Sequence, residues 1–326
     1  MARSIESVRH CVLEKTDTHG IQAAGQRFTE IEMQPTMARD GMRYWCMRPH
    51  ARLQPWVVCY YYVEPDPQIP ATLILPIDER QLILPDGHAE IVFPLTGGFE
   101  RGRIDGDSAC ATMSSSYVIG GRSHSVNTRS FGALRLAGIK LHSDALWHVT
   151  GTPLGEFRDA TLALTQLNYK PLLDLEGAVS DARCAAAIRQ AFDDFLLREL
   201  RGSIEQDPVV TELRRHVGRS GGSVSISQWL RRHQITERTL ERRFIARTGM
   251  TPKQYARVVR FKSSYLHFVS DVPRGASKRY LEPYYDQSHF DREFAAFLGM
   301  TPAAMLSRNA GARTTVSDHL LRSEAA

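Results

Sequence analysis

The sequence predicts a two-domain protein of mixed class. Its N-terminal domain is expected to be β-rich, barrel- or sandwich-like and α+β, and its C-terminal domain all-α, with two helix-turn-helix units joined by a long helix. Three observations support this prediction. The 326 residues suit two domains, short apolar runs between turn residues fill the first half, and a segment of the last third is repeated.

Six short apolar runs in the first half predict strands of an antiparallel sheet, because no helices alternate with them. They are Trp56–Val63, Thr72–Ile77, Gln81–Pro85, Glu90–Leu95, Ser116–Ile119 and Gly132–Leu141. In the last run, Leu134 and Leu136 occupy even positions, whereas Ile139 and Leu141 occupy odd positions, which would face the other side of a regular strand. The change of parity predicts a β-bulge at Gly138.

A long helix is expected over Asp181–Leu200, where apolar residues recur at helical spacing. This stripe could cover the β-domain or pair with a second subunit. Asp207-Pro208 then supplies an N-cap and a first-turn proline for the next helix. We therefore expect a β-rich domain over residues 1–204, an α-helical domain over 205–310 and a flexible tail over 311–326.

An internal repeat dominates the C-terminal domain. Leu240-x-Arg242-x-Phe244 followed by Gly249-Met250-Thr251-Pro252 recurs as Phe290-x-Arg292-x-Phe294 followed by Gly299-Met300-Thr301-Pro302. Every matched position is displaced by 50 residues. The repeat predicts two copies of one supersecondary unit.

Each copy contains the start and stop residues of a helix. Thr236 and Asp286 are good N-caps, Gly249 and Gly299 are suited to end the helices, and Thr-Pro then begins another. The inward positions are expected to be Leu240 and Phe244 in the first copy and Phe290, Phe294 and Phe297 in the second. In the first copy a shorter helix with Ile226, Trp229 and Leu230 inward precedes the turn at Gln234-Ile235, which completes a helix-turn-helix pattern.

Residues Pro252 to Ser270 are predicted to form one helix between the copies. At a rise of ~1.5 Å per residue it would span roughly 28 Å, close to the ~34 Å between successive major grooves on one face of DNA. This helix could set two recognition helices one turn of DNA apart.

Charge and cysteine usage limit the class of protein. Residues 205–310 hold 18 Lys and Arg against 10 Asp and Glu, a net charge of +8, whereas the remainder has 23 against 26, a net charge of −3. This asymmetry indicates a polyanion-binding C-terminal domain, although a merely solvated basic surface would look the same. The five scattered cysteines are expected to be reduced thiols, and no signal peptide or membrane span is predicted, which favours the cytoplasm.

The quoted motifs resemble those of the AraC/XylS family of bacterial regulators. The likeness rests on Thr236–Phe244, Gly249–Tyr255 and Tyr284–Phe290 through Thr301-Pro302, and covers roughly residues 207–308. It implies a sequence-specific transcriptional regulator, an activator, with two recognition helices in adjacent major grooves. The implied partners are double-stranded operator or promoter DNA, RNA polymerase, a small-molecule effector and a second copy of the chain, without a membrane.

The resemblance also implies which side chains contact DNA. In the first unit these are Glu237, Arg238, Thr239, Arg242 and Arg243, and in the second Gln287, Ser288, His289, Asp291 and Arg292. Arginine can bind guanine through two hydrogen bonds, glutamine can bind adenine, and Ser or Thr can hold phosphates. The alternative for each is a solvated helix face or an ion pair, such as Glu241 with Arg238 or Arg242.

The second unit departs from the family before Tyr284. Lys278, Arg279 and Glu282 stand where buried residues are expected, and Pro283 stands at the turn, where it excludes positive φ. A shifted register would bury Tyr280 and Leu281 instead.

The resemblance gives the N-terminal domain an effector-sensing or dimerising role. Leu84-Pro85-Asp86-Gly87 favours a tight turn, as the family's β-rich variants show at this point. An alternative is an enzymatic or metal-binding β-domain, with His88, Glu90, His124 and His142 as conceivable ligands. Neither the spacing of a metal site nor any catalytic motif is present, so no enzyme, metal or cofactor is expected.

Overall fold

The computed structural model describes residues 36–37, 41–69, 81–103, 111–151, 154–200, 207–271 and 278–309. The expected strand Thr72–Ile77 and the expected tail 311–326 lie outside these ranges. Of the cysteines, Cys46, Cys59 and Cys184 are described, and no disulfide joins any two of these three.

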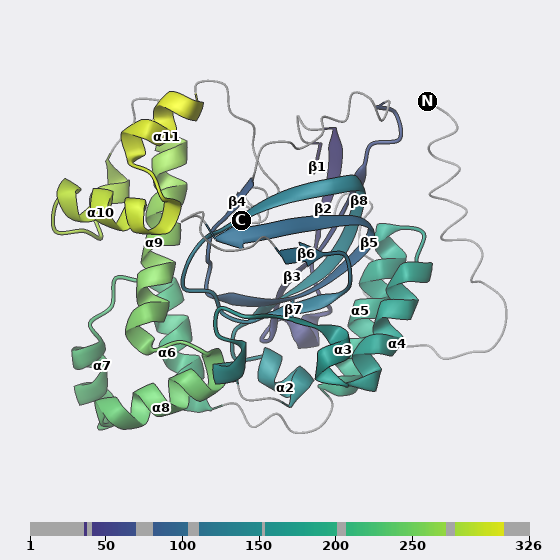
Figure 1. Ribbon diagram of the computed structural model, residues 1–326. Coiled ribbons are helices and arrows are strands. Elements are labelled where there is room, and N and C mark those ends of the chain that lie inside the picture. The colour runs from purple at the N-terminus through teal and green to yellow at the C-terminus, as the bar shows by residue number, and fades with distance from the viewer. Residues whose placement is uncertain are drawn as a thin grey trace.

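The N-terminal half forms one antiparallel sheet in the order β1-β2-β3-β8-β5-β7-β9, with β4 also paired to β8 and β6 to β5 (Figure 1). The strands are β1 Thr36–Met37, β2 Met42–Met47, β3 Val57–Pro65, β4 Gln81–Ile83, β5 His88–Arg103, β6 Ala111–Met113, β7 Tyr117–Ile119, β8 Val126–His142 and β9 Thr161–Ala163. The described part of the chain thus confirms the predicted β-rich domain. Strands β5 and β8 extend beyond their apolar runs, and β1, β2, β6 and β9 were not predicted.

The predicted bulge at Gly138 is wrong. Gly138 pairs in regular register with Tyr61 on β3 and Val92 on β5, whereas the register shifts of β5 lie between Pro94 and Gly98. The parity changes because both faces of β8 are buried. Ala137, Ile139 and Leu141 join one core, and Leu134 and Leu136 join the core on the opposite face. Glycine is needed at position 138 because a Cβ there would lie 2.2 Å from the Tyr61 ring.

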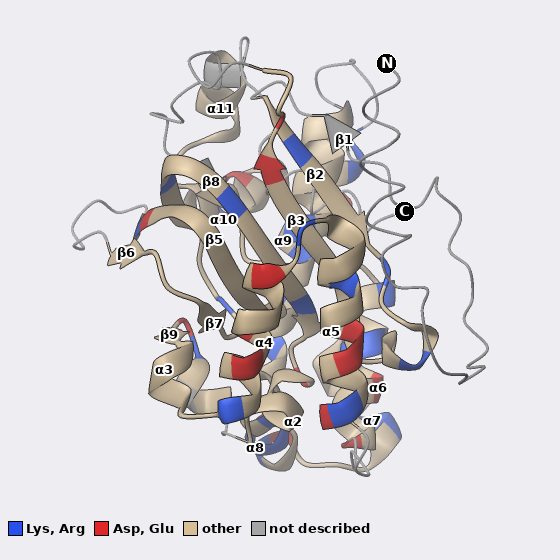
Figure 2. Ribbon diagram, turned by 90° about the vertical axis from the view of Figure 1, so that its right-hand side faces the viewer, with Lys and Arg blue, Asp and Glu red and all other residues tan. Residues whose placement is uncertain are grey.

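Two helices cover the first of these cores. They are α4 (Lys170–Asp181) and α5 (Ala185–Glu199), and Phe192 of α5 contacts the rings of Tyr60 and Phe93 on the sheet. The outer surfaces of both helices carry interspersed acidic and basic residues (Figure 2). The stripe predicted over Asp181–Leu200 therefore packs within its own domain, and α4 was missed.

Four short helical elements lie between the strands, or between the last strand and α4. They are η2 Ala51–Leu53, α2 Leu146–Thr150, η3 Leu154–Phe157 and α3 Leu164–Leu167. Leu146, Val149 and Phe157 are buried in the core beneath α4 and α5, so this segment is a fixed part of the N-terminal domain.

The C-terminal domain is helical and has its own core. Its helices are α6 Pro208–Arg219, α7 Ile226–His233, α8 Glu237–Thr248, α9 Pro252–Asp271, the 3-10 turn η5 Arg279–Leu281, α10 Gln287–Leu298 and α11 Pro302–Asn309. The inward residues predicted for α8 and α10 are all at most 2% exposed, and α9 is the predicted long helix. In the described ranges, no helix has the length and apolarity to cross a membrane.

The two domains meet along α6, α8 and α9. Gly87 of the Leu84–Gly87 turn lies against Tyr255 of α9, and Leu84 belongs to the C-terminal core. In a second contact between the domains, Arg247 of α8 lies over the ring of Trp147, with its Cζ 4.1 Å from the ring centroid. The turn predicted from sequence therefore also contacts the helical domain.

Candidate nucleic-acid interface

The first unit consists of α7 and α8 joined by three residues. Ser225 caps α7 by accepting a hydrogen bond from the Gln228 amide, and Gln234 ends the helix with a φ of 51°. Thr236 then caps α8 by accepting from the Thr239 amide, as predicted, and Gly249 ends it with a φ of 75°. These local contacts fix the start of α8 with its first turn open to solvent.

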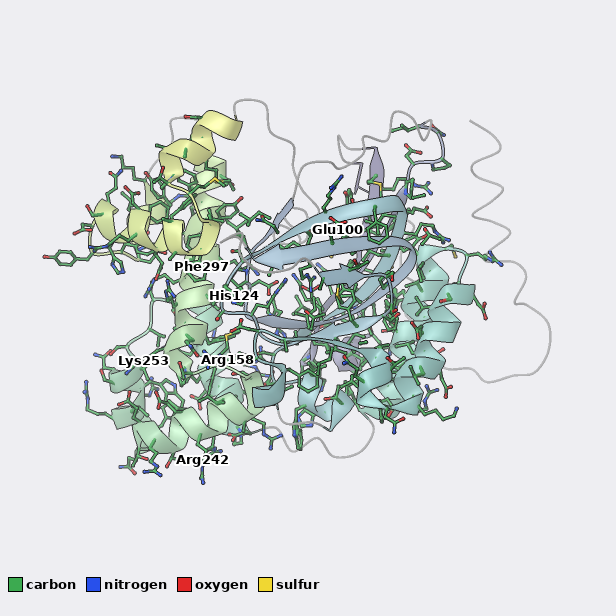
Figure 3. The ribbon with its side chains drawn as sticks, in the orientation of Figure 1. Glu100, His124, Arg158, Arg242, Lys253 and Phe297 are labelled. Carbon is green, nitrogen blue, oxygen red and sulfur yellow. The ribbon has the colours of Figure 1, made fainter. Side chains whose placement is uncertain are left out.

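The first two turns of α8 carry the expected contact residues. Glu237, Arg238 and Arg242 are exposed, and Arg242 points away from the body of the molecule (Figure 3). Glu237 pairs with Lys253 at 2.6 Å. Among the described residues, neither Arg238 nor Arg242 has a carboxylate partner. Neither of them therefore forms the alternative ion pair with Glu241. Both guanidinium groups are available to an external anion or base.

Thr239 and Arg243 make internal contacts. The Thr239 hydroxyl accepts a hydrogen bond from the Thr236 hydroxyl at 2.9 Å. Arg243 donates two hydrogen bonds to Asp207, of 2.6 and 2.5 Å. Burial tends to raise the pKa of Asp207, but the bonds from Arg243 and from the α6 amides lower it overall. Asp207 thereby caps α6 and ties it to α8.

The second unit begins with a 3-10 turn. In η5, Tyr280 is buried and Leu281 packs on the core, while Lys278, Arg279 and Glu282 are exposed, as the shifted register requires. The Tyr280 ring contacts Phe268 and Phe290. Within the described residues, the segment directly before Pro283 is therefore one 3-10 turn that buries Tyr280.

Helix α10 follows with the predicted cap. Asp286 accepts from the His289 amide at 2.7 Å, and Gly299 ends the helix with a φ of 66°. Gln287, Ser288 and Arg292 are exposed, Asp291 is half-buried, and the His289 ring lies edge-on to Tyr284. Gln287, Ser288 and Arg292 thus form the open face of this helix.

A charged contact that sequence reasoning missed holds α10 to α9. The carboxylate of Glu293 is buried and accepts hydrogen bonds of 2.9 Å from both Arg257 and Arg260. Although burial tends to raise its pKa, the bond from Arg260 leads the interactions that lower it. The available clue was an acidic residue on the apolar side of α10, between Phe290 and Phe297.

Helix α9 separates the two units. Figure 1 shows α8 beside one end of α9 and α10 beside the other. The 20 residues of α9 span about 30 Å at the usual helical rise. This length approaches the ~34 Å repeat of the major groove on one face of DNA.

The residues considered as metal ligands do not gather at one site. His124 pairs with Asp159, with 3.1 Å between Nδ1 and Oδ1, and Glu90 accepts a hydrogen bond from Tyr61. His88 and His142 pair across β5 and β8, with ring centroids 5.5 Å apart. Within the described ranges, no three His, Cys, Asp or Glu side chains are grouped to hold a metal ion.

The chain is similar to known proteins in two comparisons. Residues 46–163 match a family described as a domain of unknown function, DUF6597, whereas no curated protein matches the chain. Among solved structures, ToxT from Vibrio cholerae O395 is 11% identical, with a TM-score of 0.41 over 72% of this chain and 95% of that one.

A second ToxT structure from Vibrio cholerae, with an unsaturated fatty acid bound, is 10% identical, with a TM-score of 0.36 over 70% of this chain and 91% of that one. Vicilin from Capsicum annuum is 14% identical, with a TM-score of 0.23 over 42% of this chain and 39% of that one. The matched family model begins near the end of β2 and ends with β9, so it covers most of the sheet of the N-terminal domain and leaves the repeated helical units outside it.

Proposed function

We propose that the chain is a sequence-specific, DNA-binding transcriptional regulator of the AraC/XylS type that acts as an activator in the bacterial cytoplasm. Helices α8 and α10 would enter adjacent major grooves of one DNA face. The N-terminal domain would sense a small molecule or dimerise, and bound RNA polymerase would be the target of activation. The single observation that carries the proposal is the 50-residue repeat, which builds two capped helices at opposite ends of α9.

The predicted contact residues divide into three proposed roles. Arg238 and Arg242 would contact base edges or phosphates from α8, and Gln287, Ser288 and Arg292 from α10, because these groups are open to solvent. Glu237, Thr239, His289 and Asp291 would lie at the edges of the two contact surfaces. Arg243 would instead position α8, since Asp207 already holds its guanidinium group.

The charge distribution supports DNA as the partner. The net charge of +8 over residues 205–310 favours a polyanion, and a regulator neutralises several phosphates when it binds. Many of the arginines are nevertheless used internally, including Arg214, Arg243, Arg257 and Arg260. Specific contacts are therefore expected to come from a small number of exposed side chains.

Fluorescence anisotropy would test the proposal, using the full chain and DNA from upstream of its own gene. Binding to this fragment at least about 10³-fold tighter than to unrelated DNA, with an affinity that falls steeply with salt, is the expected result. Equal, weak binding to both fragments at every salt concentration would contradict sequence-specific regulation from that site.

A further inference from the structure

A pocket with a volume of about 600 Å³ lies between the two domains. Its lining residues are Gln54, Pro55, His88 and His142 from the N-terminal domain, and Arg214, Arg215, Gly218, Arg219 and Tyr255 from the C-terminal domain. The volume falls within the range of sites for small molecules. Because both domains supply walls, the pocket exists only while they are in contact.

The described lining carries positive charge from three arginines. It also contains two histidines, and no acidic residue is among the described lining residues. Arg214 is already paired with Asp144. The side chains of Arg215 and Arg219 are exposed, and neither has a carboxylate partner in the described part of the chain. Nε of Arg219 donates to the Arg215 carbonyl at 3.4 Å. The other donors of the two guanidinium groups, one turn apart on α6, remain open to an anion in this pocket.

A buried polar atom marks the inner wall. Nδ1 of His142 is inaccessible to solvent and makes no hydrogen bond within the described residues. Such atoms are usually satisfied by a partner, because leaving one unpaired costs free energy. Burial lowers the pKa of His142 well below its usual value, and the nearby charges of Arg214, His88, Arg215 and Lys262 lower it further. The positive charges of Arg214 and Arg215 on α6 and of Lys262 on α9 therefore all lower the pKa of His142.

We infer that this pocket binds a compact anion with two or more carboxylate or phosphate groups, and that the bound anion holds the two domains together. Arg215 and Arg219 would bind the anionic oxygens, and the histidine pair would contact the ligand from the sheet.

The consequence for DNA binding rests on the proposed function. A ligand that binds only the docked arrangement stabilises it, and the docked arrangement fixes α6 and α8 relative to the sheet through Arg214 and Arg247. The anion is therefore an effector that changes the affinity for DNA. Binding of the anion itself does not depend on any property of the DNA site.

The first experiment measures anion binding without DNA. Citrate and inorganic pyrophosphate are the probes, acetate is the weak-anion control, and sodium chloride keeps the ionic strength constant. The expected result is a saturable rise in melting temperature with at least one of the two probes and none with acetate. No saturable rise with either probe would overturn the inference.

Paired variants locate the site. The double variant Arg215→Ala with Arg219→Ala should weaken probe binding at least about tenfold, because charge-assisted hydrogen bonds are lost. Its control, Arg231→Ala with Arg232→Ala, removes two exposed arginines of α7 that do not line the pocket, and should bind the probe as the unaltered chain does. Equal weakening in both variants would overturn the assignment to this pocket.

The second experiment repeats the anisotropy titration with and without saturating probe. A several-fold change in DNA affinity that disappears in the Arg215 and Arg219 variant is expected. If that variant instead weakens DNA binding and reduces its salt dependence while no probe binds, the two arginines contact DNA phosphates and the inference fails. Probe binding with an unchanged DNA affinity would overturn the regulatory part alone.

Discussion

Asp144, two residues beyond β8, forms a buried ion pair with Arg214 of α6, with Oδ1 and Nε 3.0 Å apart. The two side chains are only 7% and 6% exposed, and the Thr211 hydroxyl donates to the same carboxylate at 3.2 Å. The contact joins residues of the sheet domain to the first helix of the DNA-binding candidate. It is therefore a direct, buried contact between the two halves of the chain.

Removing this link should uncouple the domains. Asp144→Ala leaves a buried guanidinium group without its partner, and losses of this kind cost about 3–5 kcal/mol. We expect calorimetry to show a lower melting temperature and two separate unfolding transitions. The control Asp174→Ala breaks the exposed pair with Lys170, which should cost less than about 0.5 kcal/mol. A single, unshifted transition in Asp144→Ala would contradict the predicted role.

Gly138→Ala should destabilise the sheet domain by about 1–3 kcal/mol, because the added methyl would overlap the buried ring of Tyr61. Urea unfolding measures the change. Gly177→Ala in α4 is the matched control, since nothing lies within 4 Å of its added methyl, and it should stabilise the helix by about 0.5–1 kcal/mol. A neutral Gly138→Ala would mean that the ring of Tyr61 moves aside freely.

Glu293→Gln should loosen the second recognition unit, because Arg257 and Arg260 would lose a shared charged partner. We expect specific DNA affinity to fall about tenfold, or ~1.4 kcal/mol, while α8 keeps its contacts. Anisotropy on specific and unrelated DNA checks this. Glu282→Gln, at an exposed position beside η5, is the control and should change the affinity little. Unaltered binding by Glu293→Gln would show that α10 needs no anchor.

Acidification should weaken the domain contact through His148. Burial and then the charge of Arg247 lower its pKa to about 4, against a raising effect of Asp144. Between pH 6.5 and 4 the unfolded chain therefore binds more protons than the folded one, so the stability present above pH 6.5 is lost as the pH falls. Because His148 is half exposed, we expect about 1 kcal/mol from this group.

Urea unfolding at pH 7.0 and 5.0 measures the effect. His148→Gln should show a smaller loss of stability on acidification than the unaltered chain, because its side chain does not titrate. The same loss in both proteins would assign the pH dependence to other groups.

The predictable parts of the structure are those fixed by local chemistry. Caps such as Thr236 and Asp286 and the glycines that end α8 and α10 follow from backbone geometry within one turn, and the sequence repeats them visibly. Strand β8 shows the limit. Its change of parity suggested a bulge, whereas two cores on opposite faces of the sheet produced it.

The contacts made over long distances in the sequence could not be predicted. Glu293 is paired with residues 33 and 36 positions away, and Arg243 with Asp207, also 36 positions away. In the sequence, Glu293 and Arg243 look like ordinary charged helix residues. Only the packing of helices decides which arginines are held internally and which, like Arg242, remain open. The pocket at His142 is likewise lined by residues of both domains, so no local sequence motif predicts it.

Hydroxyl-radical footprinting on the upstream fragment tests the central claim most directly, because it maps both units on one DNA molecule. Insertion of α8 and α10 into adjacent major grooves predicts two protected patches on one face, about 10 base pairs apart. Arg242→Ala should weaken the first patch and Arg292→Ala the second. A single protected patch, or patches that respond equally to both variants, would contradict a two-helix mode of binding.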